Sequence, residues 1–364
     1  MPLAGLSAIL QKLCATNWFI AGMTARRIGF NASNGAYIPF LPMARYLDDT
    51  QRNTLVRLGT SWTWRTEWPT WALIVTIYGS WFGVASHARS LGLPLTAALL
   101  GLLSTWYMSL QHELLHGHPT RSRFFNALLG FAPLAVWFPY GIYRDLHLRH
   151  HDDVHLTRPE HDPESYFVSV DVWQRAGAAT RVLLRLRNTF AGRLLVGPAF
   201  AIAVTASEAV RKVGRGDWSD VPLWLAHGVS VAALAWWLQT VCAVPAWLFV
   251  LGVGYIALSL GSIRSFHEHR AADAVEHRTV LNEAGWFWRL LFLNNNYHLV
   301  HHDLPHVPWY ALRGVYETSR QQYIERSGGF LVKGYGEWLK LHAVAPVASP
   351  VYGNITASNR ELCD

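Results

Sequence analysis

Three long stretches of the chain contain no Asp, Glu, Lys or Arg, and their lengths predict two helical hairpins. Residues 68–86 and 90–111 each approach the roughly 20 apolar residues that a helix needs to span a bilayer. Residues 221–263 are too long for a single span, so they predict two further helices, 221–241 and 246–263, that turn near Pro245. The pattern predicts an all-α integral membrane protein with four transmembrane helices in two hairpins.

Two other apolar stretches are predicted to lie along the membrane surface as interfacial helices. Residues 124–143 carry no charge, but Pro133 and Pro139 interrupt them, and proline inside a helix kinks or breaks it. Residues 194–207 are shorter and follow Arg193. The chain then divides into an N-terminal cytosolic or interfacial segment (1–66), a single membrane domain (67–343) and a C-terminal tail (344–364).

Composition and charge agree with this interpretation and orient it. The chain is 51% hydrophobic and 15% charged, which is below the usual quarter for soluble proteins. Its net charge is +7, yet the turns after the first and third predicted spans contain only Arg89. By the positive-inside rule, both termini face the cytoplasm. The positive charge is therefore explained by topology, and no basic stripe on a recognisable fold indicates a nucleic-acid partner.

Histidine is concentrated in four windows, 112–118, 147–161, 267–269 and 298–306, which hold fourteen of the eighteen histidines. Residues three or four apart on a helix share one face, so such spacing directs imidazoles at one point. A metal ion is the natural occupant of that point. Three windows contain clusters with this spacing: His112-x-x-x-His116, His147-x-x-His150-His151 and His298-x-x-His301-His302.

All four windows can meet on one side of the membrane. Residues 112–118 lie at the exit of the second predicted span and residues 267–269 at the exit of the fourth, and the other two windows follow in polar segments. A span through 124–143 would place the first two clusters on opposite faces. This is a second reason to keep that stretch on the surface, and the orientation rule then places the histidines in the cytoplasm.

The number of imidazoles indicates two metal ions. Neutral imidazole suits zinc, copper, iron and nickel, so the ligand type alone does not identify the metal. One tetrahedral zinc uses about four ligands. The three clusters supply eight imidazoles, and His267 and His269 could add two more. A pair of irons is the usual reason to gather so many histidines beside a membrane.

The clusters resemble the three histidine boxes of the membrane fatty acid desaturase and hydroxylase superfamily. Their order, spacing and placement after hairpins match, and the resemblance covers roughly residues 65–315, including the Pro-rich continuation from Asp303 to Tyr310. Within the superfamily, the chain is similar to bacterial desaturases that include the dihydrorhizobitoxine type, whose substrate is not an ordinary fatty acid. The boxes read His112-Glu-Leu-Leu-His116, His147-Leu-Arg-His150-His151 and His298-Leu-Val-His301-His302.

The resemblance implies a mushroom-shaped fold with a non-haem diiron centre under a cytosolic helical cap. It also implies a further ligand just after the last span, for which we choose His269. The predicted metal ligands are His112, His116, His147, His150, His151, His269, His298, His301 and His302. Possible additional ligands or supports for the ligands are His267, His118, Glu113, Asp153, Glu268 and Asp303. The acidic run Glu160, Asp162 and Glu164 could order a loop or meet a polar group of the substrate.

The resemblance further implies an O2-dependent desaturase with two irons as its cofactor. Such an enzyme introduces a C=C bond into a fatty-acyl or other lipid-like, amphiphilic substrate, and a hydroxylase of the same superfamily remains the alternative. The three cysteines show no C-x-x-C pairing, and no His-Pro-Gly-Gly haem signature is present. We therefore expect a separate electron donor, which would be a ferredoxin, rubredoxin or cytochrome with its reductase. The expected location is the bacterial inner membrane, with the active site in the cytoplasm.

Two other classes compete with this prediction. The first box, His112-Glu113-x-x-His116, is also the zinc metalloprotease pattern, with Glu113 as the general base. An intramembrane protease would leave the other two boxes unexplained. A histidine-rich metal transporter should place ligands within its spans, whereas His227 is the one histidine inside the predicted helices away from their cytoplasmic ends.

Overall fold

The computed structural model describes residues 48–151 and 153–353, which are mostly helical. The long helices are α4 (Trp68–Ser86), α6 (Leu93–Leu115) and α13 (Val221–Thr240). A π-helical turn, η3 (Leu248–Val253), continues directly into α14 (Gly254–Arg264). Apolar helices therefore occupy the places predicted for all four spans, although the fourth is shorter. Residues 1–47 of the predicted N-terminal segment and residues 354–364 of the predicted tail lie outside the described residues.

Two of these helices have the length and composition needed to cross a membrane. They are α6 and α13, whereas α14 is shorter. A third crossing is possible if the bent pair of helices within residues 123–150 is taken as one span. Helix α4 has 19 residues, but three tryptophans, a tyrosine and several small polar residues reduce its hydropathy. The apolar helices are thus observed, while the four-span topology stays a prediction.

Proline and glycine determine where the long helices begin. Pro69, Pro94 and Pro222 each lie in the first turn of a long helix, where a missing N–H group costs no intrahelical hydrogen bond. Gly92 separates α5 (Ala88–Leu91) from α6 with a φ of 77°, which glycine adopts without strain. The second predicted span therefore begins later than expected, at Leu93, and extends past the predicted end into the first histidine box.

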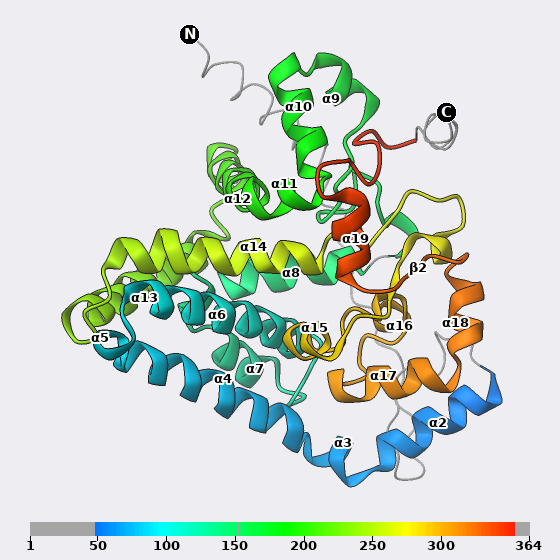
Figure 1. Cartoon of the computed structure of the whole chain (residues 1–364), viewed down its shortest axis with the longest axis horizontal. Helices are drawn as coiled ribbons and strands as arrows, with labels where there is room; N and C mark the ends of the chain where they lie inside the picture. The colour runs from blue at the N-terminus through cyan, green and yellow to red at the C-terminus, as the bar shows by residue number, and fades with distance from the viewer. Residues whose placement is uncertain (1–47, 152, 354–364) are drawn as a thin grey trace.

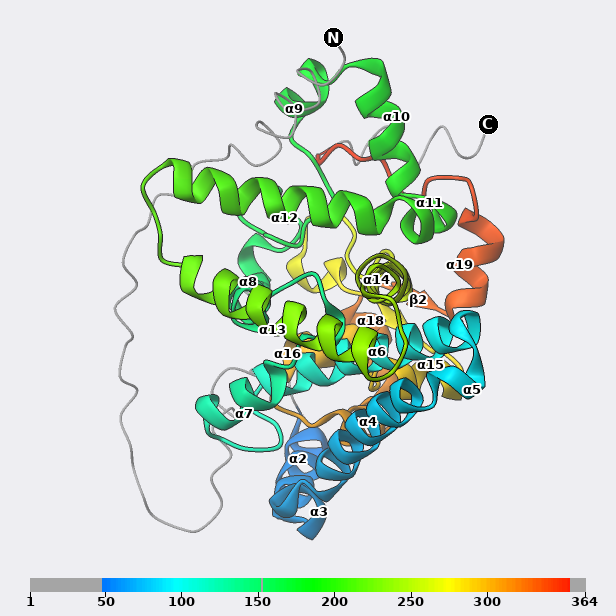
Figure 2. The ribbon, with the colours of Figure 1, turned by 90° about the vertical axis from the view of Figure 1, so that its left-hand side faces the viewer.

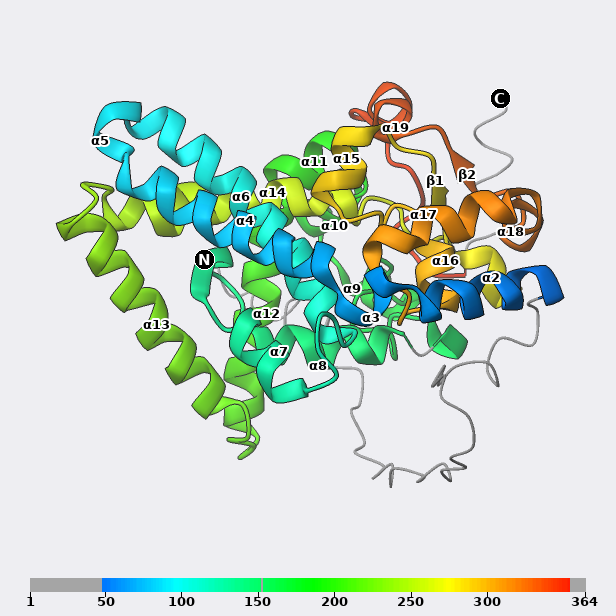
Figure 3. The same cartoon turned by 90° about the horizontal axis from the view of Figure 1, so that it is seen from below.

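Both hairpin turns lie at the same extremity of the molecule. Figures 1 and 3 show α5 and the turn between α13 and α14 together at one end, and residues 298–326, which contain α16 to α18, at the other. Figure 2, in which α14 is seen end-on, shows α12 (Gly197–Gly214) above it and α6 and α4 below it. The segments that follow α6 and α14 therefore emerge at the end of the hairpins opposite to their turns.

Close contacts hold α6 between its neighbours. The Trp81 indole of α4 donates to the Ser104 hydroxyl of α6 at 3.0 Å. One turn earlier in α6, a Cβ at Gly101 would lie 2.4 Å from Cγ2 of Ile256 in α14, whereas a Cβ at Gly79 in α4 would meet nothing within 4 Å. Helices α6 and α14 can pack this closely because Gly101 has no side chain.

The apolar stretch 124–143 is broken, as its prolines predicted. It comprises α7 (Arg123–Gly130), the 3-10 turn η1 (Pro133–Ala135) and the start of α8 (Tyr140–His150), and the two helical arms meet at 110°. The imidazole of His227 in α13 binds the carbonyl of Val136 at 2.6 Å and so fastens the bend to a long helix. Residues 194–207 lie mostly in α12 (Gly197–Gly214), with Leu194 and Leu195 in the preceding α11 (Phe190–Leu195), and their place at the membrane surface stays a prediction.

The remaining elements are called the cap below, and several of them pack around the histidine windows. Their cores contain the apolar faces of α2, α16, α17 and α18 in one cluster and of α11, α15 and α19 in another. Short β-strands pair in parallel between Leu281 and Leu331. The further bounds are α2 (Asp49–Thr60), α3 (Trp62–Thr66), η2 (Asp153–His155), α9 (Val170–Arg175), α10 (Ala178–Arg187), α11 (Phe190–Leu195), α12 (Gly197–Gly214), η4 (Val275–Arg278), β1 (Leu281–Asn282), α15 (Trp286–Leu291), α16 (His298–Asp303), α17 (Trp309–Thr318), α18 (Arg320–Arg326), β2 (Leu331–Val332) and α19 (Tyr335–His342).

Polar contacts connect the cap to the long helices and hold its own elements together. Trp106 and Ser109 of α6 donate to the backbone carbonyls of Leu290 and Leu291 in α15, at 2.9 and 2.8 Å. Within the cap, Glu283 accepts from the Arg320 guanidinium and the Tyr316 hydroxyl. The last turns of α6 are thereby fixed relative to the segments that carry the third histidine box.

Candidate metal centre

Four segments far apart in the sequence bring nine imidazoles together. The last turn of α6 and the residue after it carry the first box, α8 ends in the second, and α16 consists largely of the third. His269 comes from the loop that follows α14. These are the nine residues that were predicted as ligands.

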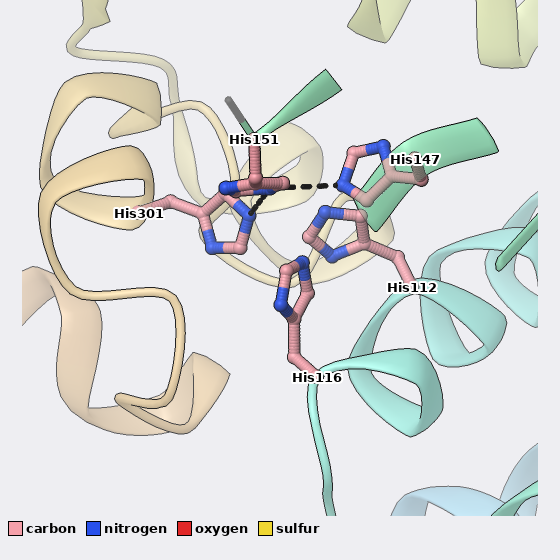
Figure 4. A group of neighbouring side chains, drawn as sticks. All are labelled: His112, His116, His147, His151 and His301. Carbon is pink, nitrogen blue, oxygen red and sulfur yellow. Dashed lines mark hydrogen bonds between the residues drawn. The ribbon is translucent and has the colours of Figure 1, made fainter. Parts of the chain in front are cut away.

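The nine imidazoles divide into two groups, in each of which the candidate ligand nitrogens all lie within 4.8 Å of one another. Figure 4 shows the first group, in which the rings converge from α6, α8 and α16. Group A consists of His112, His116, His147, His151 and His301. Group B consists of His150, His269, His298 and His302.

Helical geometry explains how the residues are divided. On a helix of 3.6 residues per turn, positions i and i+4 are about 40° apart, whereas i+3 lies about 100° from i+4. In the second box, His147 and His151 enter group A and His150 enters group B. In the third box, the i and i+4 pair enters group B and the i+3 residue, His301, enters group A. An H-x-x-H-H segment between two sites therefore serves both of them.

The imidazole nitrogens face one another at short distances. In group B, Nε2 of His269 lies 3.1 Å from Nε2 of His150 and 3.1 Å from Nε2 of His298. In group A, Nε2 of His151 lies 3.1 Å from that of His147 and 3.2 Å from that of His301. Such spacing between ring nitrogens is about what two ligands on one metal show when each bond is close to 2.1 Å.

Carboxylates fix which ring nitrogen is free to bind a metal. Nδ1 of His147 lies 2.9 Å from Glu164, and Nδ1 of His150 lies 2.8 Å from Asp162. An ionised carboxylate only accepts, so each Nδ1 carries a proton and each Nε2 is the nitrogen left to bind a metal. Among the described residues, Nε2 of His112 is buried without a hydrogen-bond partner, as a nitrogen directed at a metal position would be. The residues present therefore fit two bound cations.

Burial keeps several of these imidazoles neutral. Burial and then the neighbouring imidazoles hold the pKa values of His116, His151, His298 and His301 well below the usual range for histidine. The neutral form is the one that binds a metal. Burial raises the pKa of Glu164, but the imidazoles of His147 and His150 outweigh it and lower that pKa overall, which keeps the carboxylate charged. The site thus combines neutral ligands with a negative charge behind them.

Asp162 and Glu164 are the residues whose role the sequence did not assign. The acidic run is visible in the sequence, but only the turn after α8 brings it back under the second box. Asp162 also accepts from the backbone N–H groups of Thr157 and Glu164, at 2.8 and 2.9 Å. Asp162 therefore both orders the loop and orients the imidazole of His150. The known preference of metal-bound histidines for carboxylate partners was the one available signal.

The other candidate residues lie outside both groups. His267 packs its ring against Phe330 and Trp338, with centroid distances of 5.1 and 6.2 Å. His118 pairs with Glu67 at 2.8 Å. Asp303 pairs with Arg326, Glu268 lies 3.4 Å from Arg264 and 3.8 Å from Nε2 of His298, and the side chain of Asp153 lies outside the described part of the chain.

Glu113 lies beside the first box but is held by a backbone group. One of its oxygens accepts from the N–H of Trp309 at 3.0 Å, and the other lies 3.7 Å from Nδ1 of His112. In a zinc protease, this carboxylate would act as a base on metal-bound water. Here the backbone of α17 occupies it, and five imidazoles gather beside it in place of the three protein ligands that a catalytic zinc usually has.

Comparisons with known proteins point to the same family that the histidine boxes resemble. A family model described as fatty acid desaturase matches residues 88–332, a range that contains all nine histidines. Among curated proteins, the chain is similar to a fatty acid desaturase of Bacillus subtilis (strain 168). The two chains are 26% identical over 267 residues, which cover 67% of this chain and 73% of that protein.

Proposed function

The chain belongs to the fatty acid desaturase family, and on this premise we propose that it is a membrane-bound, O2-dependent diiron desaturase. Its substrate would be a fatty-acyl or other lipid-like, amphiphilic molecule that gains a C=C bond. The observation that carries the proposal is the division of nine buried or half-buried imidazoles into two groups. One metal would use only about half of these ligands.

Iron is favoured over other metals by the chemistry that the family performs. Two groups of neutral imidazoles could hold several divalent metals, and the ligands alone do not choose among them. When bound, a pair of irons supplies the electrons and the Lewis acidity that allow O2 to remove hydrogen from unactivated C–H bonds. The overall change consumes the substrate, O2, two electrons and two protons, and it yields the alkene and two waters.

The protein's own residues position the imidazoles for this chemistry. Glu164 and Asp162 hold the rings of His147 and His150, while Thr279 and Asn295 contact Nδ1 of His269 and His298, each at 3.2 Å. All four contacts leave Nε2 directed at a metal position. Fixed rings disfavour rearrangement of the ligands when the metal changes charge, which is the role that such contacts have in metalloenzymes generally.

The location of the groups supports a substrate that approaches from the membrane. Both groups lie at the end of the apolar helix α6, beyond its Trp106 and Ser109 contacts with the cap. A lipid chain lying along the hairpins could reach this level without leaving an apolar environment. The electron donor, by contrast, would have to dock on the polar cap, and we propose a separate ferredoxin, rubredoxin or cytochrome there. The cytoplasmic orientation and the inner-membrane location are parts of the same proposal.

Metal analysis tests the proposal most directly. The protein would be produced in iron-replete cells, purified in detergent without metal-affinity chromatography, and analysed for iron and zinc per chain by mass spectrometry. About two irons per chain, one for each imidazole group, are expected. A single zinc that ferrous iron cannot replace would overturn the diiron proposal and favour hydrolytic chemistry.

Product analysis then separates desaturation from hydroxylation. Both reactions begin with removal of the same hydrogen, so the metal ligands do not distinguish them. Cells with and without the protein would be compared by lipid and metabolite profiling under 18O2. A product that loses two mass units supports the desaturase, whereas a product that gains labelled oxygen supports the hydroxylase.

A further inference from the structure

A polar hollow on the cap leads from the surface to the histidine groups. Its volume is about 200 Å3, well above the roughly 10–15 Å3 that one water molecule needs. His302 of group B forms part of its wall. Thr279, which also lines the hollow, contacts Nδ1 of His269 at 3.2 Å. The hollow therefore touches one ligand of group B directly and a second through a hydroxyl group.

The walls of this hollow are held by buried polar contacts. Arg278 is buried and donates to the backbone carbonyls of Leu156, Ala272 and Asp273, which ties the loop around η4 to the segment after the second box. Asp303 and Arg326, which also line the hollow, form a two-pronged pair at 2.9 Å. The hollow is consequently a built feature of the cap and does not depend on a single side-chain position.

The exposure of the imidazoles points to the same side. His112, His147, His150, His298 and His301 are at most 3% exposed. His151 and His269 are half-buried, and each of their rings lies within 5 Å of the His302 ring, with centroid distances of 4.3 and 4.9 Å. The most accessible imidazoles of the two groups thus lie around the residue that the hollow reaches.

We propose that this hollow is the route by which ferrous ions load the two sites from the cytoplasm, with Val275 and Glu276 at its mouth. The inference rests on the proposed diiron function. A hydrated cation cannot cross the apolar helices, because removing its water without replacement ligands is very costly. The hollow has room for a hydrated cation and reaches the imidazole of His302. Glu276 is an exposed carboxylate that lines the hollow and attracts a cation to it.

The order of loading follows from the geometry. An ion in the hollow first meets His302 and then the rest of group B, because His269 and His298 lie directly beside His302. Group A lies behind it, since the ring of His302 stacks on that of His151 at 4.3 Å. Ions bound for group A would therefore pass through group B. Neighbouring imidazoles connect the two groups, and no apolar side chain separates His302 from His151.

The rate of iron uptake, measured by quenching at intervals, tests the route without enzymatic turnover. Detergent-purified protein would be stripped of metal, mixed with ferrous iron without O2, and quenched with a strong chelator at intervals, and bound iron would be measured by mass spectrometry. Val275→Trp should obstruct the hollow and slow uptake about tenfold, which corresponds to a barrier increase of roughly 1.4 kcal/mol. Glu276→Gln should slow uptake less, and its effect should fade at high salt. Val344→Trp, at a position that is 81% exposed and does not line the hollow, is the matched control.

A blocked route differs from a damaged site in its thermodynamics. Obstruction slows iron uptake and chelator-driven iron loss by the same factor, so the equilibrium affinity and the final iron content stay at their native values. Val275→Phe, a smaller intrusion, should give an intermediate effect if Val275→Trp does not fold. Native uptake and loss rates in both variants would overturn the route. If the native chain bound no iron at all, the proposed function itself would fail, which is a distinguishable result.

Discussion

Asp162 provides the sharpest test of how the protein supports its imidazoles. Asp162 is 6% exposed, and its carboxylate accepts three hydrogen bonds, from Nδ1 of His150 and from the backbone N–H groups of Thr157 and Glu164. The substitution Asp162→Asn preserves the shape of the side chain but replaces one acceptor oxygen by an NH2 group. If the remaining oxygen faces His150 and Glu164, the new NH2 group faces the N–H of Thr157, donor against donor.

Two separate losses are expected from Asp162→Asn. The N–H of Thr157 loses its partner in a buried place, which costs about 1–3 kcal/mol of folding free energy. The imidazole of His150 loses a charged acceptor, and such supporting contacts are worth about 10–100-fold in metal affinity. That loss corresponds to about 1.4–2.7 kcal/mol. The free energy of metal binding should therefore fall even where the metal-free protein remains folded.

Two measurements distinguish these losses. Iron affinity is obtained from competition with a chelator of known strength, and the stability of the metal-free protein from thermal unfolding in detergent. Asp171→Asn is the matched control, because Asp171 is exposed and forms only a surface pair with Arg175. Unchanged iron affinity in Asp162→Asn, with a folded protein, would refute the argument that the carboxylate supports a metal ligand.

Three further predictions concern the site, the helix packing and the cap. His301→Ala should remove the iron of group A and abolish turnover, and unchanged iron content in this variant would contradict the ligand assignment. His87→Ala should change neither property, because His87 is exposed and its ring contacts the carbonyl of Gly83 in the preceding turn of helix. Gly101→Ala should destabilise the protein by about 1–3 kcal/mol through overpacking, whereas Gly79→Ala should be neutral in the same thermal assay. The arginine partner of Glu283 lowers the pKa of that carboxyl, so its contribution is present above the usual glutamate pKa and is lost as pH falls through the lowered value; Glu283→Gln should lower the melting temperature slightly at pH 7, and the difference should shrink on acidification.

The apolar helices could be predicted because each depends on local sequence. The first span was placed at residues 68–86, and the helix has the same bounds. The bend in 124–143 followed from its two prolines. The second helix was predicted to begin too early, because its actual beginning depends on the positive φ of Gly92. The residues of the predicted span before and after this glycine are all uncharged, so composition alone does not show where the helix begins. Whether four helices cross the membrane depends on the bilayer as well as on the chain.

The histidine site could be predicted as a set but not as two groups. Helical spacing shows that His147 and His151 share a face, and this was enough to expect convergence. Which metal position each imidazole serves depends on where α6, α8 and α16 lie relative to one another, which no local pattern records. The same reason hid Asp162, which reaches His150 through a turn 12 residues later in the chain. His267 and His269 have similar neighbours in sequence, and only the path of the loop separates them.

The two imidazole groups also determine when in the life of a chain the centre can exist. Group A needs His112 and His301, and group B needs His150 and His302, so a ribosome must have released most of the described chain before either group is complete. The first hairpin consequently has to fold with bare imidazoles. Pairs such as Glu67 with His118, buried and independent of any metal, suit that interval. A chain that stops early would therefore carry lone histidine boxes without a complete imidazole group.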